Sequence, residues 1–323
     1  MKKLICVILS TLLTLCLIIA GCGNNKCTIT LVQDGQKDIV LSVEKGSKPT
    51  LPEPVQFSNN SIITEWNVPD NFVAEENKTI QAISYTSGII FNFRNYHLET
   101  AVVVQTYNGE SPIVIIPEYY RGYPIKVLAR SAFKNQSHVV KITLPEGLEE
   151  VQYYPFQGLS NLTSVNIPST LKRLESYAFC DAKNSGTSIV PSGIISVPDH
   201  AFLGFRGERA VFEEGVEYIY KFVFAGKNNL KEIVLPSTVK EISFLAFCWQ
   251  PVEKIFYAGR EGDFNNVRFI DDRDDGERID ENVKKIDERI NDGDTIVYYY
   301  SEAEPIFGGN FWHYVNGEVT IWE

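Results

Sequence analysis

Hydrophobic residues in the middle of the chain recur with a period of about 23 residues. The clearest marker is a phenylalanine, which returns at Phe133, Phe156, Phe179, Phe202, Phe224 and Phe247. A unit of this length cannot bury its apolar side alone, so it must stack on copies of itself. The pattern therefore predicts a mainly β fold, a solenoid of about six coils whose repeat core is this row of phenylalanines.

Within one coil, the spacing of apolar residues predicts which side chains face inward. Val165 and Ile167 alternate at the two-residue period of a strand, and Pro168 ends that strand because it has no backbone N–H to donate. Leu171 and Leu174 follow at the spacing of a tight or 3₁₀-like turn. We expect the next phenylalanine to fill the coil interior, where each buried ring contributes roughly 2 to 3 kcal/mol.

The same register identifies outward side chains, which are the candidate ligand surface. In the last four coils the position between the two inward strand residues becomes apolar, at Ile189, Val211, Val234 and Phe256. This stripe is either a ligand face or a β-branched strand surface covered by a C-terminal segment. Covering is favoured because the stripe grows toward the end where a cap must dock. A second candidate surface lies two positions before the phenylalanines, at Tyr154, Tyr177, His200 and Phe222.

A separate β module precedes the coils, over residues 28–86. The runs Thr28–Val32 and Ile39–Val43 surround Asp34-Gly35, which is a strong hairpin signal. Two further short strands are predicted, Ile62–Trp66 and Thr79–Tyr85, and Trp66 is the expected core anchor.

Residues 265–323 follow the coils, which we place at 87–264, and they predict an acidic helix and a terminal hairpin. Apolar residues at intervals of four and three define one helix face, between an N-cap at Asp275 and Gly293; they are Ile279, Val283, Ile286 and Ile290. An amphipathic helix packed on the array is the favoured interpretation, rather than a calcium loop at Asp271–Asn282. The Asn316-Gly317 turn then predicts a hairpin that caps the last coil.

The first residues predict export. Met1-Lys2-Lys3 precede an apolar run of 17 residues, Leu4–Ala20, with no basic stop-transfer cluster after it. A signal peptide over residues 1–21 is favoured over a retained membrane helix.

The end of this segment, Ile19-Ala20-Gly21-Cys22, resembles the bacterial lipobox. The resemblance implies cleavage between Gly21 and Cys22, diacylglycerol on the Cys22 sulfur and a short tether over residues 22–27. We therefore expect an extracytoplasmic protein that is lipid-anchored in a bacterial cell membrane and faces the cell surface. A plain secretory signal with an incidental cysteine is the alternative.

The repeated phrase, best seen from Leu162 to Phe179, resembles the BspA-like leucine-rich repeats of bacterial surface proteins, with its proline and Ala-Phe at matching offsets. The segment Tyr119–Pro124 resembles the opening hairpin of such proteins. Residues 28–86 resemble the internalin-type B-repeat, a small β-grasp-like module. That resemblance implies a spacer or a weak adhesive unit, and a spacer is favoured.

The net charge and the reactive side chains exclude several classes of function. The formal charge is −11, and it becomes −13 when residues 1–21 with their two lysines are removed. The sequence has no basic stripe, so nucleic acid is not expected as a partner. Cys180 and Cys248 lie three coils apart, roughly 14 Å, which is too far for a disulfide. The four histidines are scattered, and we find no metal-ligand pair, nucleophile elbow or phosphate loop, so no cofactor is expected.

Together these features predict a non-enzymatic, lipid-anchored cell-surface binding protein, expected to be a monomer, whose solenoid holds an extracellular protein or glycan. One alternative is a surface-anchored enzyme or enzyme accessory subunit, which would need a convergent pocket of titratable groups. Another is a solute-capture lipoprotein, which would need two α/β lobes.

Overall fold

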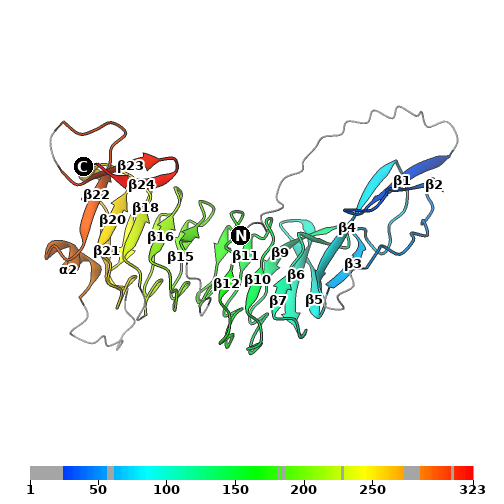
Figure 1. Ribbon diagram of the computed structural model, residues 1–323, viewed down its shortest axis with the longest axis horizontal. Coiled ribbons are helices and arrows are strands. Elements are labelled where there is room, and N and C mark those ends of the chain that lie inside the picture. Colours follow the sequence, from blue (N-terminus) through cyan, green and yellow to red (C-terminus); the bar gives the residue numbers. More distant parts are fainter. Residues whose placement is uncertain are drawn as a thin grey trace, which may run out of the picture.

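The computed structural model describes residues 25–56, 62–180, 182, 186–226, 229–272, 284–306 and 309–322. The molecule is an elongated row of strands, with a small module at one end and the C-terminal hairpin at the other (Figure 1). The predicted signal peptide, Cys22, Asp275, Ile279 and Val283 lie outside the described residues. Within those residues, no helix has the length and apolar character needed to cross a membrane.

The N-terminal module is a four-stranded sheet in the order β2-β1-β4-β3. Its strands are β1 (Lys26–Val32), β2 (Ile39–Glu44), β3 (Ile62–Trp66) and β4 (Lys78–Thr86). The central pair β1 and β4 is parallel, and both outer pairs are antiparallel. Trp66 is buried in the module core beside Ile29 and Leu31, and its Nε1 donates to the Pro52 carbonyl at 2.6 Å. The indole therefore holds the Pro-rich segment against the sheet.

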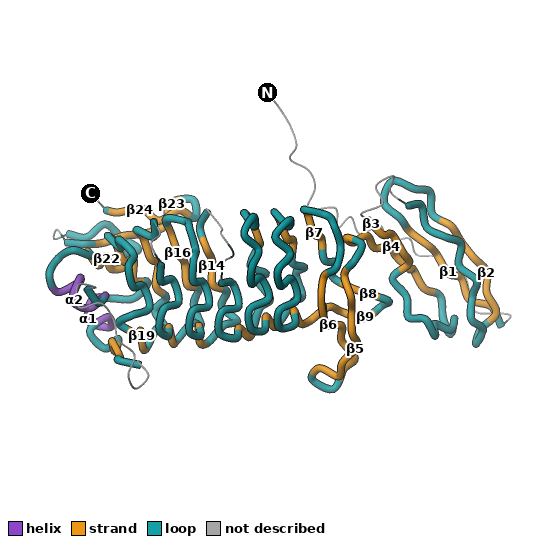
Figure 2. The backbone as a smooth tube through the Cα atoms, turned by 90° about the horizontal axis from the view of Figure 1, so that it is seen from below, coloured by secondary structure: helices purple, strands orange, loops and turns teal. Residues whose placement is uncertain are grey.

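The repeat region stacks its coils through two ladders of parallel strands, seen along the row in Figure 2. The first ladder contains β7 (Ile113–Ile115), β10 (Lys141–Thr143), β12 (Ser164–Val165), β14 (Ser188–Val190), β16 (Arg209–Phe212), β18 (Glu232–Leu235) and β20 (Lys254–Tyr257). The second contains β9 (Tyr123–Leu128), β11 (Glu150–Val151), β13 (Arg173–Leu174), β15 (Ser196–Val197), β17 (Tyr218–Ile219), β19 (Glu241–Ser243) and β21 (Arg268–Ile270). Among the described residues each ladder has one interruption, between β12 and β14 and between β13 and β15.

The six repeat phenylalanines are buried in one continuous stack, the inner column. Neighbouring ring centroids are 5.0 to 6.3 Å apart, and the pair Phe179 and Phe202, at 5.3 Å and 4°, continues the stack across the interruption. The backbone repeats with the rings, because the N–H of Phe179 donates to the carbonyl of Ala201 and the N–H of Phe202 to that of Val223. The predicted solenoid core is therefore present through the interruption.

Two hairpins begin the solenoid. The predicted one joins β8 (Tyr119–Tyr120) to β9 through Arg121 and Gly122, which both have positive φ. The other, between β5 (Ile89–Tyr96) and β6 (Glu99–Tyr107), was not predicted, and it projects from the side of the array in Figure 2. Its turn uses His97 and Leu98 at positive φ without a glycine, so the usual sequence signal of a tight hairpin is missing.

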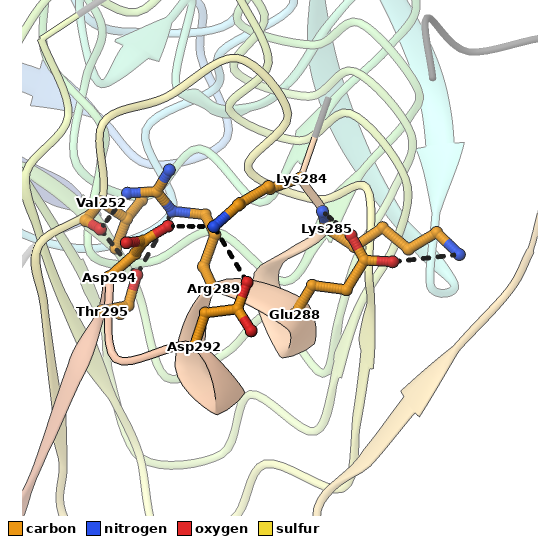
Figure 3. Close-up of polar contacts among 8 residues, drawn as sticks. All are labelled: Val252, Lys284, Lys285, Glu288, Arg289, Asp292, Asp294 and Thr295. Atoms are coloured by element: carbon orange, nitrogen blue, oxygen red, sulfur yellow. Dashed lines mark hydrogen bonds and ion pairs between the residues drawn. The ribbon is translucent and has the colours of Figure 1, made fainter. Parts of the chain in front are cut away.

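Among the described residues two short helices lie at this end of the array, α1 (Glu261–Phe264) between β20 and β21, and α2 (Ile286–Asn291) after β21. Helix α2 begins after Lys285, whose backbone N–H donates to the Glu288 carboxylate at 3.0 Å. Figure 3 shows how its surroundings are held: Lys284 binds Asp292 and Asp294, and Arg289 donates to the Val252 carbonyl at 2.9 Å. The described helix is thus shorter than the predicted one and has a different N-cap, while Ile286 and Ile290 pack on the core as predicted.

The chain ends in three more strands, β22 (Ile296–Tyr300), β23 (Phe311–Val315) and β24 (Glu318–Ile321). Strand β22 extends the first ladder, and the β23–β24 hairpin turns through Asn316 and Gly317, both at positive φ as the Asn-Gly signal predicts. Trp312 of β23 is fully buried against Val234 and Phe256. The hairpin therefore covers part of the outward side of the first ladder as well as extending its edge.

Candidate functional site

The predicted apolar stripe on the first ladder is only partly accessible. Ile189 is 46% exposed and Val211 is half-buried, but Val234 and Phe256 are only 3% and 2% exposed. Trp312 meets the Phe256 ring edge-on at 5.9 Å and donates its Nε1 hydrogen to the Tyr257 carbonyl at 2.9 Å. The last two members are buried under the C-terminal hairpin, as the favoured interpretation of the stripe predicts, so they are not available as part of a ligand face.

The second predicted surface is a continuous row of rings on the outside of the coils, which we call the outer column: Tyr154, Tyr177, His200, Phe222 and Trp249. Tyr154 stacks on Tyr177 at 4.3 Å, and Tyr177 on His200 at 4.4 Å with an angle of 8° between the rings. His200 and Phe222 are 5.0 Å apart, and Phe222 stacks on Trp249 at 6.0 Å. The structure thus brings together all four predicted residues and adds a fifth.

Every residue of the outer column has a left-handed backbone conformation, with φ between 52° and 62°. For a non-glycine residue this conformation costs roughly 1 to 2 kcal/mol, so it persists only where the surroundings determine it. Here the main chain is held between coils, since the N–H groups of Tyr177, His200 and Phe222 donate to carbonyls of the next coil. Ser131 has the same conformation at the equivalent position of the first coil, so the conformation belongs to the coil backbone, and in the next four coils the residue placed there is aromatic.

The outer column presents ring edges to solvent, because most ring faces are covered by neighbouring rings. Tyr154, Tyr177 and His200 are half-buried and Phe222 is only 7% exposed, whereas Trp249 at the end of the row is 47% exposed. Burial and the hydrogen bond to Tyr154 raise the pKa of Tyr177 to about 12. The hydroxyl therefore stays protonated well above neutral pH and, while bonded to Tyr154, can still accept a hydrogen bond.

The repeat register did not identify Trp249. The position two before Phe247 is Leu245, which is fully buried, and the ring that continues the column comes two residues after that phenylalanine. A usable signal was present, since an aliphatic residue replaces the ring at the expected position and a tryptophan follows four residues later.

Other reactive groups do not converge. No disulfide joins the cysteines of the described residues, and burial raises the pKa of the Cys248 thiol to about 11. His313 stacks on Trp322 at 3.7 Å in the terminal hairpin, far along the chain from His97 in the β5–β6 turn. A search of the described residues finds no group of three or more His, Cys, Asp or Glu side chains placed to hold a metal.

Comparison with solved structures finds leucine-rich repeat proteins of bacteria. A leucine-rich repeat protein of T. pallidum, TpLRR, is 20% identical, with 47% of this chain and 71% of that chain covered and a TM-score of 0.42. The pneumococcal vaccine antigen PcpA is 19% identical, with 54% and 44% covered and a TM-score of 0.43. A leucine-rich repeat protein from Bacteroides ovatus is 15% identical, with 66% and 70% covered and a TM-score of 0.29.

A search of curated protein sequences found no match. The family comparison concerns the coils themselves, from the first strand of the second ladder to the last strand before the helices. Residues 125–257, which carry both aromatic columns, match the BspA type leucine-rich repeat region in six copies.

Proposed function

We propose that this protein is a non-enzymatic, lipid-anchored binding protein of the bacterial cell surface, and that its solenoid holds an extracellular protein or glycan. The observation that carries the proposal is the outer column, five stacked aromatic residues in a strained backbone conformation. A row that spans several coils suits an extended ligand, as the surfaces of repeat proteins commonly do.

The chemistry of the outer column favours a protein ligand over a glycan. Sugar rings pack on the open face of an aromatic ring, and these faces are stacked against one another except at Trp249. Ring edges with tyrosine hydroxyls and a histidine instead suit hydrogen bonds to a peptide backbone, and tyrosine and tryptophan are the residues that most often anchor protein interfaces.

A lipid anchor and the N-terminal module would attach the solenoid to the cell surface and separate it from the membrane. The lipobox-like tetrad ending at Cys22 supports a lipid anchor, with two or three acyl chains holding the protein at the membrane. The sheet order and parallel central pair of the N-terminal module support its likeness to a β-grasp-like B-repeat, which would separate the coils from the membrane. The acidic surface suits a solvated exported protein.

A binding screen tests the main proposal. The purified full-length protein is passed over immobilised extracellular matrix proteins and over a glycan array, beside the Tyr154→Ala/Tyr177→Ala variant. We expect a protein ligand, bound at least tenfold more weakly by the variant. Ile195→Ala is the matched control, because Ile195 is an apolar side chain that is 58% exposed outside the column. Absence of any ligand for the folded protein, together with hydrolase turnover, would overturn the proposal.

The lipid anchor is tested separately with Cys22→Ala. The variant should be found in the medium or remain as an unprocessed precursor, because no sulfur remains to carry diacylglycerol. Cys27→Ser is the control and should stay in the membrane fraction at mature size. Membrane retention of the Cys22 variant at mature size would contradict the anchor and leave the binding proposal standing.

A further inference from the structure

A hollow of the surface lies where the N-terminal module meets the first coil, and we call it the junction cleft. Its volume is about 250 Å³, and its walls come from a module loop and from both opening hairpins of the solenoid. The principal lining residues are Pro69, Asp70, Asn71, Phe93, Arg121 and Tyr123. The cleft lies outside the outer column, whose rings belong to other coils.

The aromatic wall of the junction cleft includes Phe93, whose ring is partly exposed to solvent. Phe93 lies on β5, the edge strand of its sheet, and is 46% exposed. Tyr123 meets it edge-on, at 5.5 Å and 80°, and Tyr120 lies tilted beside it at 6.1 Å. Among the described residues, no ring packs on Phe93 as closely as Tyr177 packs on Tyr154 in the outer column, at 4.3 Å. The junction cleft therefore offers a partly exposed aromatic ring, to which only Trp249 of the outer column, at 47% exposed, is comparable.

Polar groups surround this face and are electrically balanced. Arg121 and Asp70 form an ion pair whose side chains are 39% and 75% exposed, so both retain hydrogen-bonding positions open to solvent. Asn71 lies beside them on the module loop, and Thr100 lies on the solenoid side. Because the two charges cancel, the site suits a neutral ligand with several hydroxyl groups more than a charged one.

The two modules are held together around the cleft, so its walls are prepared before any ligand binds. The Gly122 N–H donates to the Asn67 side chain, and the Ile115 N–H to the Thr86 hydroxyl, both at 2.7 Å. Gly122 is needed at this contact, because its φ is +80° and a Cβ there would lie 2.7 Å from Pro69 Cδ. Such fixed walls reduce the entropy lost on binding.

We propose that the junction cleft binds a single neutral pyranose ring, free or at the end of a glycan. The C–H face of the sugar packs on Phe93, where partly positive hydrogens meet the negative face of the ring, and its hydroxyls bond to Asp70, Asn71 and Arg121. The volume of about 250 Å³ lies just below the roughly 300 to 1,000 Å³ of pockets that take drug-sized ligands, so it suits a ligand as small as one sugar ring. The N-terminal module then contributes half of a binding site in addition to separating the coils from the membrane.

Ligand-observed NMR on the full-length protein in detergent micelles tests this site. The probes are the methyl glycosides of glucose, galactose, mannose and N-acetylglucosamine. We expect at least one to bind, and Phe93→Leu, which keeps an apolar side chain but removes the aromatic face, to weaken it roughly tenfold. Phe93→Tyr keeps the face and should bind within about twofold of wild type.

Two further variants locate the site. Asn71→Ala should weaken the sugar several-fold, and Tyr177→Ala should leave it unchanged, because Tyr177 belongs to the outer column. Circular dichroism and the unfolding midpoint of each variant establish that it is folded. The inference is overturned if no probe binds the folded wild-type protein, or if Phe93→Leu binds the probe as tightly as wild type does.

Discussion

Two aromatic columns run along the same coils only two residues apart, and they differ in almost every physical respect. The inner column is buried, stacked and set in the core. The outer column is stacked as regularly, yet three of its members are half-buried, Phe222 is buried, Trp249 is 47% exposed, and all five have positive φ. Burial explains the inner rings by stability, whereas the outer rings other than Phe222 keep part of their surface open to solvent. Periodicity alone thus does not distinguish a structural row from a binding row.

The largest effect should come from the inner column, with Phe179→Ala. Phe179 is 2% exposed and stacks on Phe156 and Phe202, so truncation leaves a cavity in the middle of the array. The free energy of unfolding should fall by about 3 to 5 kcal/mol. Urea denaturation followed by circular dichroism measures the loss, and an unchanged midpoint would contradict the structural role of the column.

The outer column should respond less, as Tyr177→Ala would show. Stacking on Tyr154 and His200 is lost, but the ring is half-buried and the strained backbone stays. We expect a loss of about 1 to 2 kcal/mol in the same denaturation experiment. A loss as large as that of Phe179→Ala would remove the distinction between the columns.

Replacing Tyr177 by glycine distinguishes the loss of ring stacking from the relief of backbone strain. Tyr177→Gly loses the same ring but tolerates a φ of 62° without steric conflict. It should therefore be more stable than Tyr177→Ala by about 1 kcal/mol. The matched pair Phe179→Gly and Phe179→Ala should show no such gain, because Phe179 is not at positive φ. Equal stabilities of Tyr177→Gly and Tyr177→Ala would show that the conformation is not strained.

The smallest effect concerns high pH. Because the folded-state pKa of Tyr177 is raised to about 12 from an ordinary value of 10.0, the folded protein holds this proton where the unfolded chain releases it. Its contribution to stability is complete below pH 10 and declines as the pH rises from 10 toward 12. Between pH 9 and 11 the unfolding midpoint of Tyr177→Phe should therefore fall slightly less than that of wild type. An identical decline would show that the Tyr177 hydroxyl does not titrate as described.

The sequence predicted what local patterns determine. Proline after a two-residue alternation ended the short strands, the phenylalanine period located the inner column, and Asn316-Gly317 located the last turn. Contacts between distant segments were not predictable in this way. Trp312 covers Phe256 from 56 positions further along the chain, and Trp249 joins the outer column only because the last coil departs from the register.

The junction cleft shows the same limit. Its aromatic wall lies on a hairpin whose turn, at His97 and Leu98, carries no glycine signal, and its polar wall comes from another module. Neither part identifies a site alone, because the geometry arises only when Pro69 docks on Gly122. The helix prediction shows a related limit: apolar spacing gives the face of a helix but not its ends. Among the described residues the helix starts only after Lys285, and the predicted start at Asp275 lies outside them.

We infer that the inner column stabilises the fold and that the outer column binds the ligand. The decisive measurement is ligand binding and unfolding together for the Tyr154→Ala/Tyr177→Ala variant, with the protein ligand that the wild type retains in the screen. We expect at least a tenfold loss of binding, with an unfolding midpoint still well above that of Phe179→Ala. Binding at the wild-type level by this variant would contradict this inference.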